Sequence, residues 1–177
     1  MAIVINLYGA PGSGKSTGAA YIFSMLKANG INAELVPEFA KDKVWEENKA
    51  VFENQAYIFG KQYFRLTRCA DKVDVIITDS PLLLSTIYNH NAVLGEDFNN
   101  VVRNVAKSFD TRNYFIKRVK KYNPVGRHQS ETEAEVISYS IWNMLRAEGI
   151  SYTAVDGNMD GYNKIVEDIL KELKNGN

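Results

Sequence analysis

The stretch Gly9-Ala10-Pro11-Gly12-Ser13-Gly14-Lys15-Ser16-Thr17 decides how this chain folds. It matches G-x-x-x-x-G-K-[ST], the spacing of the phosphate-binding P-loop. The apolar residues 3–7 precede it and predict a buried strand, and residues 15–28 predict a helix that ends at Asn29-Gly30. A strand, a glycine-rich loop and a helix in this order predict an α/β fold that binds a nucleoside triphosphate.

Each part of the motif has a physical role. The glycines let the backbone turn so that its N–H groups point at one anion, and the dipole of the following helix adds its positive end there. Lys15 supplies a cation for the outer phosphates, and the Ser16 hydroxyl is a ligand for Mg²⁺. We therefore expect ATP and Mg²⁺ as cofactors. The residues expected to bind the nucleotide in this loop are Gly9, Gly12, Ser13, Gly14, Lys15, Ser16 and Thr17.

Composition limits the class of protein. The chain has 177 residues with 21 Lys+Arg and 21 Asp+Glu, so we expect one domain over residues 1–177 with a formal net charge of zero. Zero net charge argues against an electrostatic grip on nucleic acid over the whole surface, although a local basic patch stays open. Cys69 is the single cysteine, which fits a reducing cytoplasm. No apolar run approaches the ~18 residues of a membrane span, and no signal peptide is evident, so we expect a cytoplasmic protein that does not use a membrane.

Apolar and polar patterns predict the other elements. Further strands are expected at residues 31–36, 73–78, 113–116 and 152–155. Helices are expected at about residues 42–48, 51–70, from Ser80-Pro81 onward, 99–108, 131–148 and 162–173, with a loop at 89–98. Because strands and helices alternate, the expected architecture is a five-stranded parallel sheet covered by helices on both faces.

Two acids follow apolar strands, at the sheet edge where the P-loop should lie. Asp79 ends the 73–78 run and is expected to contact Mg²⁺, with a helix N-cap as the alternative. Glu38 follows the second strand and is expected to take the proton of an acceptor hydroxyl, with a solvated or helix-capping acid as the alternative. Ser80 stands where many motor ATPases carry a second acid, which argues against that class.

Residues 117–128 form a basic stretch with five Lys or Arg, one His and no acid. We expect a lid at about residues 117–131, in which Arg118 and Arg127 stabilise the charge of the transferred phosphoryl group. The alternatives are a solvated charge run and a patch for a nucleic-acid backbone, with Tyr122 and His128 as stacking side chains. The expected catalytic residues are Lys15, Glu38, Asp79, Arg118 and Arg127.

The remaining candidates concern the two substrates. Gln55 can hydrogen-bond the edge of an acceptor base, and Tyr63 or Tyr57 can stack on it, although helix packing explains the tyrosines equally well. Asp156-Gly157 follows the last predicted strand, where a loop would touch the adenine of ATP, with an ordinary turn as the alternative.

Taken together, the P-loop, Glu38, Asp79-Ser80, the basic stretch and Val155-Asp156-Gly157 resemble the small P-loop kinases of nucleosides, nucleotides and nicotinamide riboside. Almost the whole chain is also similar to a family of phage and bacterial proteins described as AAA-type ATP-binding proteins. This similarity is carried by residues 5–9, 58–62, 74–81 and 122–127.

The kinase resemblance implies a nucleotide-kinase type of P-loop NTPase, with the P-loop strand beside the Asp79 strand. It implies that Arg127 lies in a lid between the fourth strand and the next long helix. It also implies an acceptor site under the Gln55 helix, with Glu38 as the base. Ser80 departs from the pattern, because deoxynucleoside kinases usually carry an arginine there.

The leading expectation is therefore a Mg²⁺-dependent kinase that moves the γ-phosphoryl group of ATP to a small nucleoside, nucleotide or related ribosyl compound. One alternative keeps this chemistry and uses a hydroxyl on a modified base in DNA. Two others are an ATPase switch without an acceptor and a non-catalytic nucleotide-binding protein. The sequence leaves a homodimer open.

Overall fold

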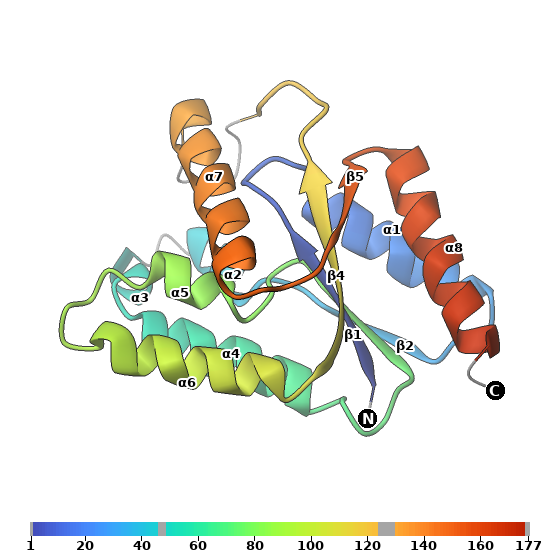
Figure 1. Ribbon diagram of the computed structural model, residues 1–177, viewed down its shortest axis with the longest axis horizontal. Coiled ribbons are helices and arrows are strands. Elements are labelled where there is room, and N and C mark those ends of the chain that lie inside the picture. The colour runs from blue at the N-terminus through green and yellow to red at the C-terminus, as the bar shows by residue number, and fades with distance from the viewer. Residues whose placement is uncertain (1, 46–48, 124–129, 176–177) are drawn as a thin grey trace.

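A five-stranded sheet forms the centre of the computed structural model, which describes residues 2–45, 49–123 and 130–175 (Figure 1). Its strands lie in the order β2-β3-β1-β4-β5, and every neighbouring pair is parallel. The described elements are β1 (Ile3–Tyr8), α1 (Lys15–Ala28), β2 (Ala33–Val36), α2 (Phe39–Trp45), α3 (Lys49–Phe52), α4 (Gln55–Thr67), β3 (Val75–Thr78), α5 (Leu84–Tyr88), α6 (Gly95–Lys107), β4 (Asp110–Lys117), α7 (Glu131–Ala147), β5 (Thr153–Asp156) and α8 (Met159–Asn175). The predicted α/β fold with a parallel sheet is thus confirmed, and β1 lies beside β3 as expected.

The two faces of the sheet differ in chemistry. Helices α1 and α8 cover one face, and α4 to α7 cover the other (Figure 1). The strand residues beneath α1 and α8, which we call the apolar face, are Ile5, Leu7, Val75, Ile77, Tyr114, Ile116 and Val155. The opposite side, which we call the polar face, mixes the apolar strand residues Val4, Tyr8 and Ile76 with the polar residues Asn6, Thr78, Thr111 and Asn113. Side chains alternate along a strand, so each strand contributes to both faces.

Helix boundaries follow local capping. Helix α1 spans the predicted residues, and Gly30 lies just beyond it with φ 81°, a left-handed conformation that favours glycine. The helix expected at 51–70 is divided into α3 and α4. Asn54 causes the break, because its side chain accepts the backbone N–H of Tyr57 at 3.0 Å and so caps α4.

Two other expected boundaries were wrong. No helix starts at Ser80-Pro81. The backbone N–H of Ser80 donates to the Thr78 hydroxyl at 3.1 Å, and residues 81–83 form a turn. Helix α5 begins only at Leu84. Helix α6 begins within the expected loop because the Asn91 side chain accepts the N–H groups of Val93 and Leu94 and turns the chain into the helix.

Two further expectations, the role of Cys69 and the absence of a membrane-spanning helix, can be compared with the structure. Cys69 is 8% exposed and packs with the polar-face core, which confirms its expected structural role. Within the described part of the chain, no helix is both long enough and apolar enough to cross a membrane.

Candidate phosphoryl-transfer site

The P-loop connects β1 to α1 with a backbone that only glycine adopts readily. Gly9, Gly12 and Gly14 have φ angles of 143°, 79° and 101°. The Lys15 ammonium group folds back over this loop and donates to the carbonyls of Gly9 at 2.7 Å and Ala10 at 3.1 Å. The loop therefore has the glycine-built turn and the cation predicted from the sequence.

Polar groups in the same loop fit a phosphate. The Ser13 hydroxyl is buried and has no hydrogen-bond partner among the described residues. Ser16 and Thr17 are exposed in the first turn of α1. A buried hydroxyl without a partner lowers the stability of the folded protein, and a bound phosphate oxygen would accept its hydrogen bond.

Asp79 follows β3 and lies beside the start of α2. It is 4% exposed, and its Oδ1 accepts the backbone N–H of Glu38 at 2.9 Å. The alternative that Asp79 caps a helix is wrong, because α5 starts only at Leu84. Mg²⁺ is usually held by one or two protein carboxylates together with phosphate oxygens and water. Asp79 and the Ser16 hydroxyl have the oxygen chemistry that such a site requires.

Glu38 lies directly before α2, and its carboxyl group is partly buried. Burial raises the pKa of Glu38 because the charged form loses hydration. The positive charge of Lys15 lowers that pKa, and the negative charge of Asp79 raises it. The interaction between charges weakens with distance, so these effects agree with the 2.9 Å hydrogen bond in placing Glu38 near Asp79 and Lys15.

Gln62 on α4 is a residue of this site that the sequence analysis missed. It is 3% exposed, and its Oε1 accepts the backbone N–H of Phe39 at 3.0 Å. Its Nε2 donates to the Pro37 carbonyl and to the Thr78 hydroxyl, both at 3.4 Å. Gln62 thus ties the segment around Glu38 to the end of β3. A glutamine in the apolar stripe of a helix was the available signal.

Helix α5 completes the surroundings of Glu38. Gln55 is 5% exposed and donates to the Ser85 hydroxyl at 3.1 Å. Burial and, second, the negative charge of Glu38 together raise the pKa of Tyr88 to about 12, so Tyr88 lies near that carboxylate. Neither Ser85 nor Tyr88 was singled out from the sequence.

The structure does not bring Tyr63 to this site. Its ring stacks on Phe59 with centroids 6.0 Å apart and meets the edge of Phe109 at 6.3 Å. Phe109 lies just before β4, at the sheet edge opposite the P-loop. Tyr63 is therefore a packing residue, which was the alternative for the tyrosines.

The described part of the basic stretch contacts α7. Arg118 lies 3.3 Å from a Glu131 carboxylate oxygen and 3.2 Å from one of Glu135, and its guanidinium lies over the Tyr122 ring. Its Nη1 is buried without a partner among the described residues. Lys117 belongs to β4 and not to the loop, and Arg127 and His128 lie outside the described residues.

Gly157 lies against the P-loop, and Asp156 precedes it at the end of β5. Gly157 N–H donates to the Lys117 carbonyl at 2.8 Å, and a Cβ at Gly157 would stand 2.1 Å from the Ser13 carbonyl oxygen. Only glycine fits such a close approach. The Asp156 carboxylate lies 3.3 Å from the Lys117 ammonium group.

Comparison with known proteins agrees with this geometry. A family model described as an AAA domain matches residues 4–161, which include most of β1, the P-loop, Glu38, Asp79 and Gly157. A comparison with curated proteins found no match.

Proposed function

Because the chain belongs to the AAA-domain family and has a complete P-loop, we propose that it is an ATP- and Mg²⁺-dependent kinase. We propose a nucleoside, nucleotide or related small ribosyl compound as the acceptor. Nucleotide binding follows from the family; the transfer to an acceptor is our inference from the residues beyond the P-loop.

One observation carries the proposal: a second carboxyl group lies beside Asp79. The Glu38 N–H donates to Asp79 Oδ1 at 2.9 Å, and the Glu38 pKa responds to both Asp79 and Lys15. A single carboxylate that binds Mg²⁺ is sufficient for a protein that only binds and hydrolyses ATP. A second, partly buried carboxyl with a raised pKa suits a general base that works near neutral pH.

The proposed reaction balances as follows. The acceptor hydroxyl oxygen forms a bond to Pγ, the bond between Pγ and the β–γ bridging oxygen breaks, and the hydroxyl proton passes to the Glu38 carboxylate. ADP leaves with the bridging oxygen. The P-loop N–H groups and Lys15 hold the phosphates, and Ser16 and Asp79 would hold Mg²⁺, which neutralises charge on the phosphate oxygens when bound.

The acceptor would lie between Glu38 and α5. Gln55, Ser85 and Tyr88 offer an amide and two hydroxyls around that carboxyl. Such groups recognise the hydroxyls of a ribose or the edge of a base.

A screen with γ-labelled ATP tests the proposal. Each nucleoside, nucleotide and ribosyl compound is incubated with protein and Mg²⁺, and DNA with a hydroxymethylated base forms a separate arm. We expect label transfer to a small acceptor, with loss of transfer in Lys15→Ala. Label on the DNA alone would identify the larger substrate instead, and slow release of free phosphate with every acceptor would contradict a kinase.

A further inference from the structure

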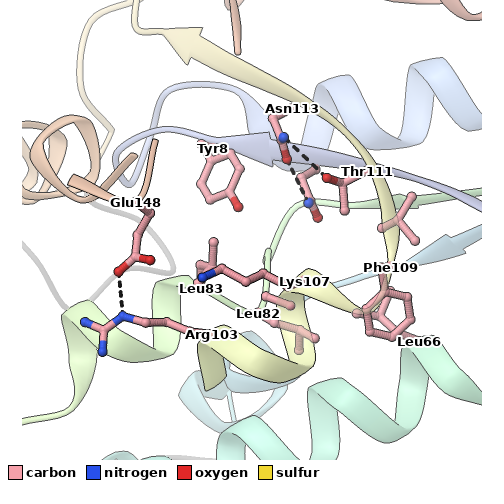
Figure 2. A pocket seen from close by; sticks show the side chains of 13 residues that line it. Tyr8, Leu66, Leu82, Leu83, Arg103, Lys107, Phe109, Thr111, Asn113 and Glu148 are labelled. Carbon is pink, nitrogen blue, oxygen red and sulfur yellow. Dashed lines mark hydrogen bonds and ion pairs between the residues drawn. The ribbon is translucent and has the colours of Figure 1, made fainter. Parts of the chain in front are cut away.

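A pocket on the polar face of the sheet lies apart from the residues assigned to phosphoryl transfer. It has a volume of about 180 Å³ and lies between β1, β4, α6 and the turn before α5 (Figure 2). A cavity of ~150 Å³ is large enough for a benzene ring. The pocket can therefore hold a single ring with a small substituent.

Two donors converge on this pocket without partners. The Tyr8 side chain is 1% exposed, and its hydroxyl points into the pocket, as does the ammonium group of Lys107 from α6 (Figure 2). Neither group has a hydrogen-bond or ion-pair partner among the described residues. Burial raises the pKa of Tyr8, so its hydroxyl keeps its proton at neutral pH and acts as a donor. The Tyr8 hydroxyl oxygen is accessible from the pocket, so a ligand or a water molecule there can accept its hydrogen bond.

Arg103 at the pocket pairs with two carboxylates. Arg103 donates to the Glu148 carboxylate at 2.5 Å and also pairs with Glu96. Among the residues that line the pocket, Arg103 and Lys107 are positive and Glu148 is negative, so the lining carries one positive charge in excess. Lys107 itself is exposed on α6. An incoming group that satisfies both Tyr8 and Lys107 must accept hydrogen bonds and carry negative charge.

The residues that line the pocket indicate what kind of molecule could carry this negatively charged group. Leu82, Leu83 and Phe109 present apolar surfaces around the pocket, while Asn6 and Asn113 hydrogen-bond to each other on the strands at 3.0 Å. Apolar walls with a few placed polar groups are typical of small-molecule sites. They favour a flat ring over a highly hydrated ion.

We propose that this pocket binds a small single-ring carboxylate, with its oxyanion between the Tyr8 hydroxyl and the Lys107 ammonium group and its ring between Leu83 and Phe109. Tyr8 directly precedes Gly9 of the P-loop, so the ligand would contact the strand end that carries the nucleotide loop. The proposal does not depend on kinase activity.

Direct binding to the full chain tests it. Calorimetry with benzoate, nicotinate and orotate, each alone, should give saturable binding of at least one, and its neutral amide should bind about tenfold more weakly or not at all. Tyr8→Phe and Lys107→Met should each weaken binding by about tenfold or more, as for a lost hydrogen bond to a charged group. Lys164→Met, which changes an exposed lysine on α8, is the matched control and should not change affinity.

Controls separate this site from the P-loop and from a structural role. Binding should persist in Lys15→Ala, which removes the P-loop cation. Without ligand, Tyr8→Phe should be at least as thermally stable as the wild type, because it removes an unpartnered hydroxyl. The proposal is overturned if none of the three carboxylates binds, if Lys15→Ala abolishes binding, or if neither Tyr8→Phe nor Lys107→Met weakens it.

Discussion

The two faces of the sheet support the site in different ways. On the apolar face, hydrophobic strand residues pack against α1 and α8, and the buried ring of Tyr162 lies directly against Gly18. The Tyr162 hydroxyl donates to the Gly14 carbonyl at 2.9 Å and so reaches the P-loop. On the polar face, buried hydrogen bonds of Gln62 and Gln55 hold the segment around Glu38 and helix α5, where the acceptor is proposed to bind.

The apolar face therefore supports the P-loop that binds the nucleotide, and the polar face supports Glu38, the proposed general base. On the apolar face, close packing holds the backbone of the P-loop in place. A mutation that adds a larger side chain there should therefore destabilise the fold. On the polar face, buried hydrogen bonds hold Glu38 near Asp79. A mutation that removes one partner leaves the other buried group unsatisfied, which destabilises this arrangement. Mutations on the apolar face should therefore reduce stability first, and mutations on the polar face should change turnover.

The largest expected effect is on turnover at the polar face. Glu38→Gln should lower kcat by about 10²–10⁴-fold, the range for a lost general base, while ATP affinity stays within a factor of a few. Phosphoryl transfer to the acceptor and ATP titration measure the two quantities. Glu34→Gln on β2 is the matched control, and equal turnover of Glu38→Gln and wild type would remove Glu38 from the reaction.

The next effect is on stability at the apolar face. A Cβ at Gly18 would meet the Tyr162 ring at 2.6 Å, and that ring is held by its neighbours and its hydrogen bond. Gly18→Ala should lower the free energy of unfolding by ~1–3 kcal/mol, measured by urea denaturation. Gly60→Ala is the control: nothing lies within 4 Å of a Cβ there, so the helix α4 should gain up to about 1 kcal/mol. Similar losses in both variants would argue against the packing explanation.

A mutation in the polar network should affect stability and turnover together. Gln62→Met keeps much of the volume but leaves the buried Phe39 N–H without its acceptor, which costs ~1–3 kcal/mol. Because the segment around Glu38 loses its tie to β3, kcat should fall while ATP affinity is retained. Gln55→Met, which breaks only the bond to Ser85, is the comparison variant. A loss of stability with kcat unchanged would make Gln62 purely structural.

The smallest effect is a pH dependence of stability. The folded state raises the pKa of Glu38 above its ordinary value of 4.5, because burial disfavours the charged form. The stability from the protonated carboxyl is complete below the unfolded-state pKa, and it is lost as pH rises through the raised folded-state pKa. Glu38→Gln should remove this decline, so the variant should gain stability relative to the wild type as the pH rises above the ordinary carboxyl pKa of 4.5. Parallel pH profiles of the two proteins in urea denaturation would contradict it.

Much of the fold could be predicted because its signals are local. The glycine pattern at the P-loop requires particular φ angles, and the apolar run before Asp79 requires burial, so both are encoded within a few residues. Caps formed by asparagine side chains were harder, since Asn54 and Asn91 changed helix boundaries without changing the order of elements.

The sequence alone determined the features of the nucleotide-binding region: the glycine-built turn, the Lys15 cation and the carboxylate that follows β3. Only the tertiary structure decided which groups meet there. Glu38 and Asp79 are 41 residues apart, and Tyr162 and Gly14 are 148 apart, yet each pair is joined by a hydrogen bond. Such contacts depend on the strand order β2-β3-β1 and on how α4 and α8 pack across it. Local periodicity carries no information about that packing, and so Gln62 and Tyr88 became visible only in the folded chain.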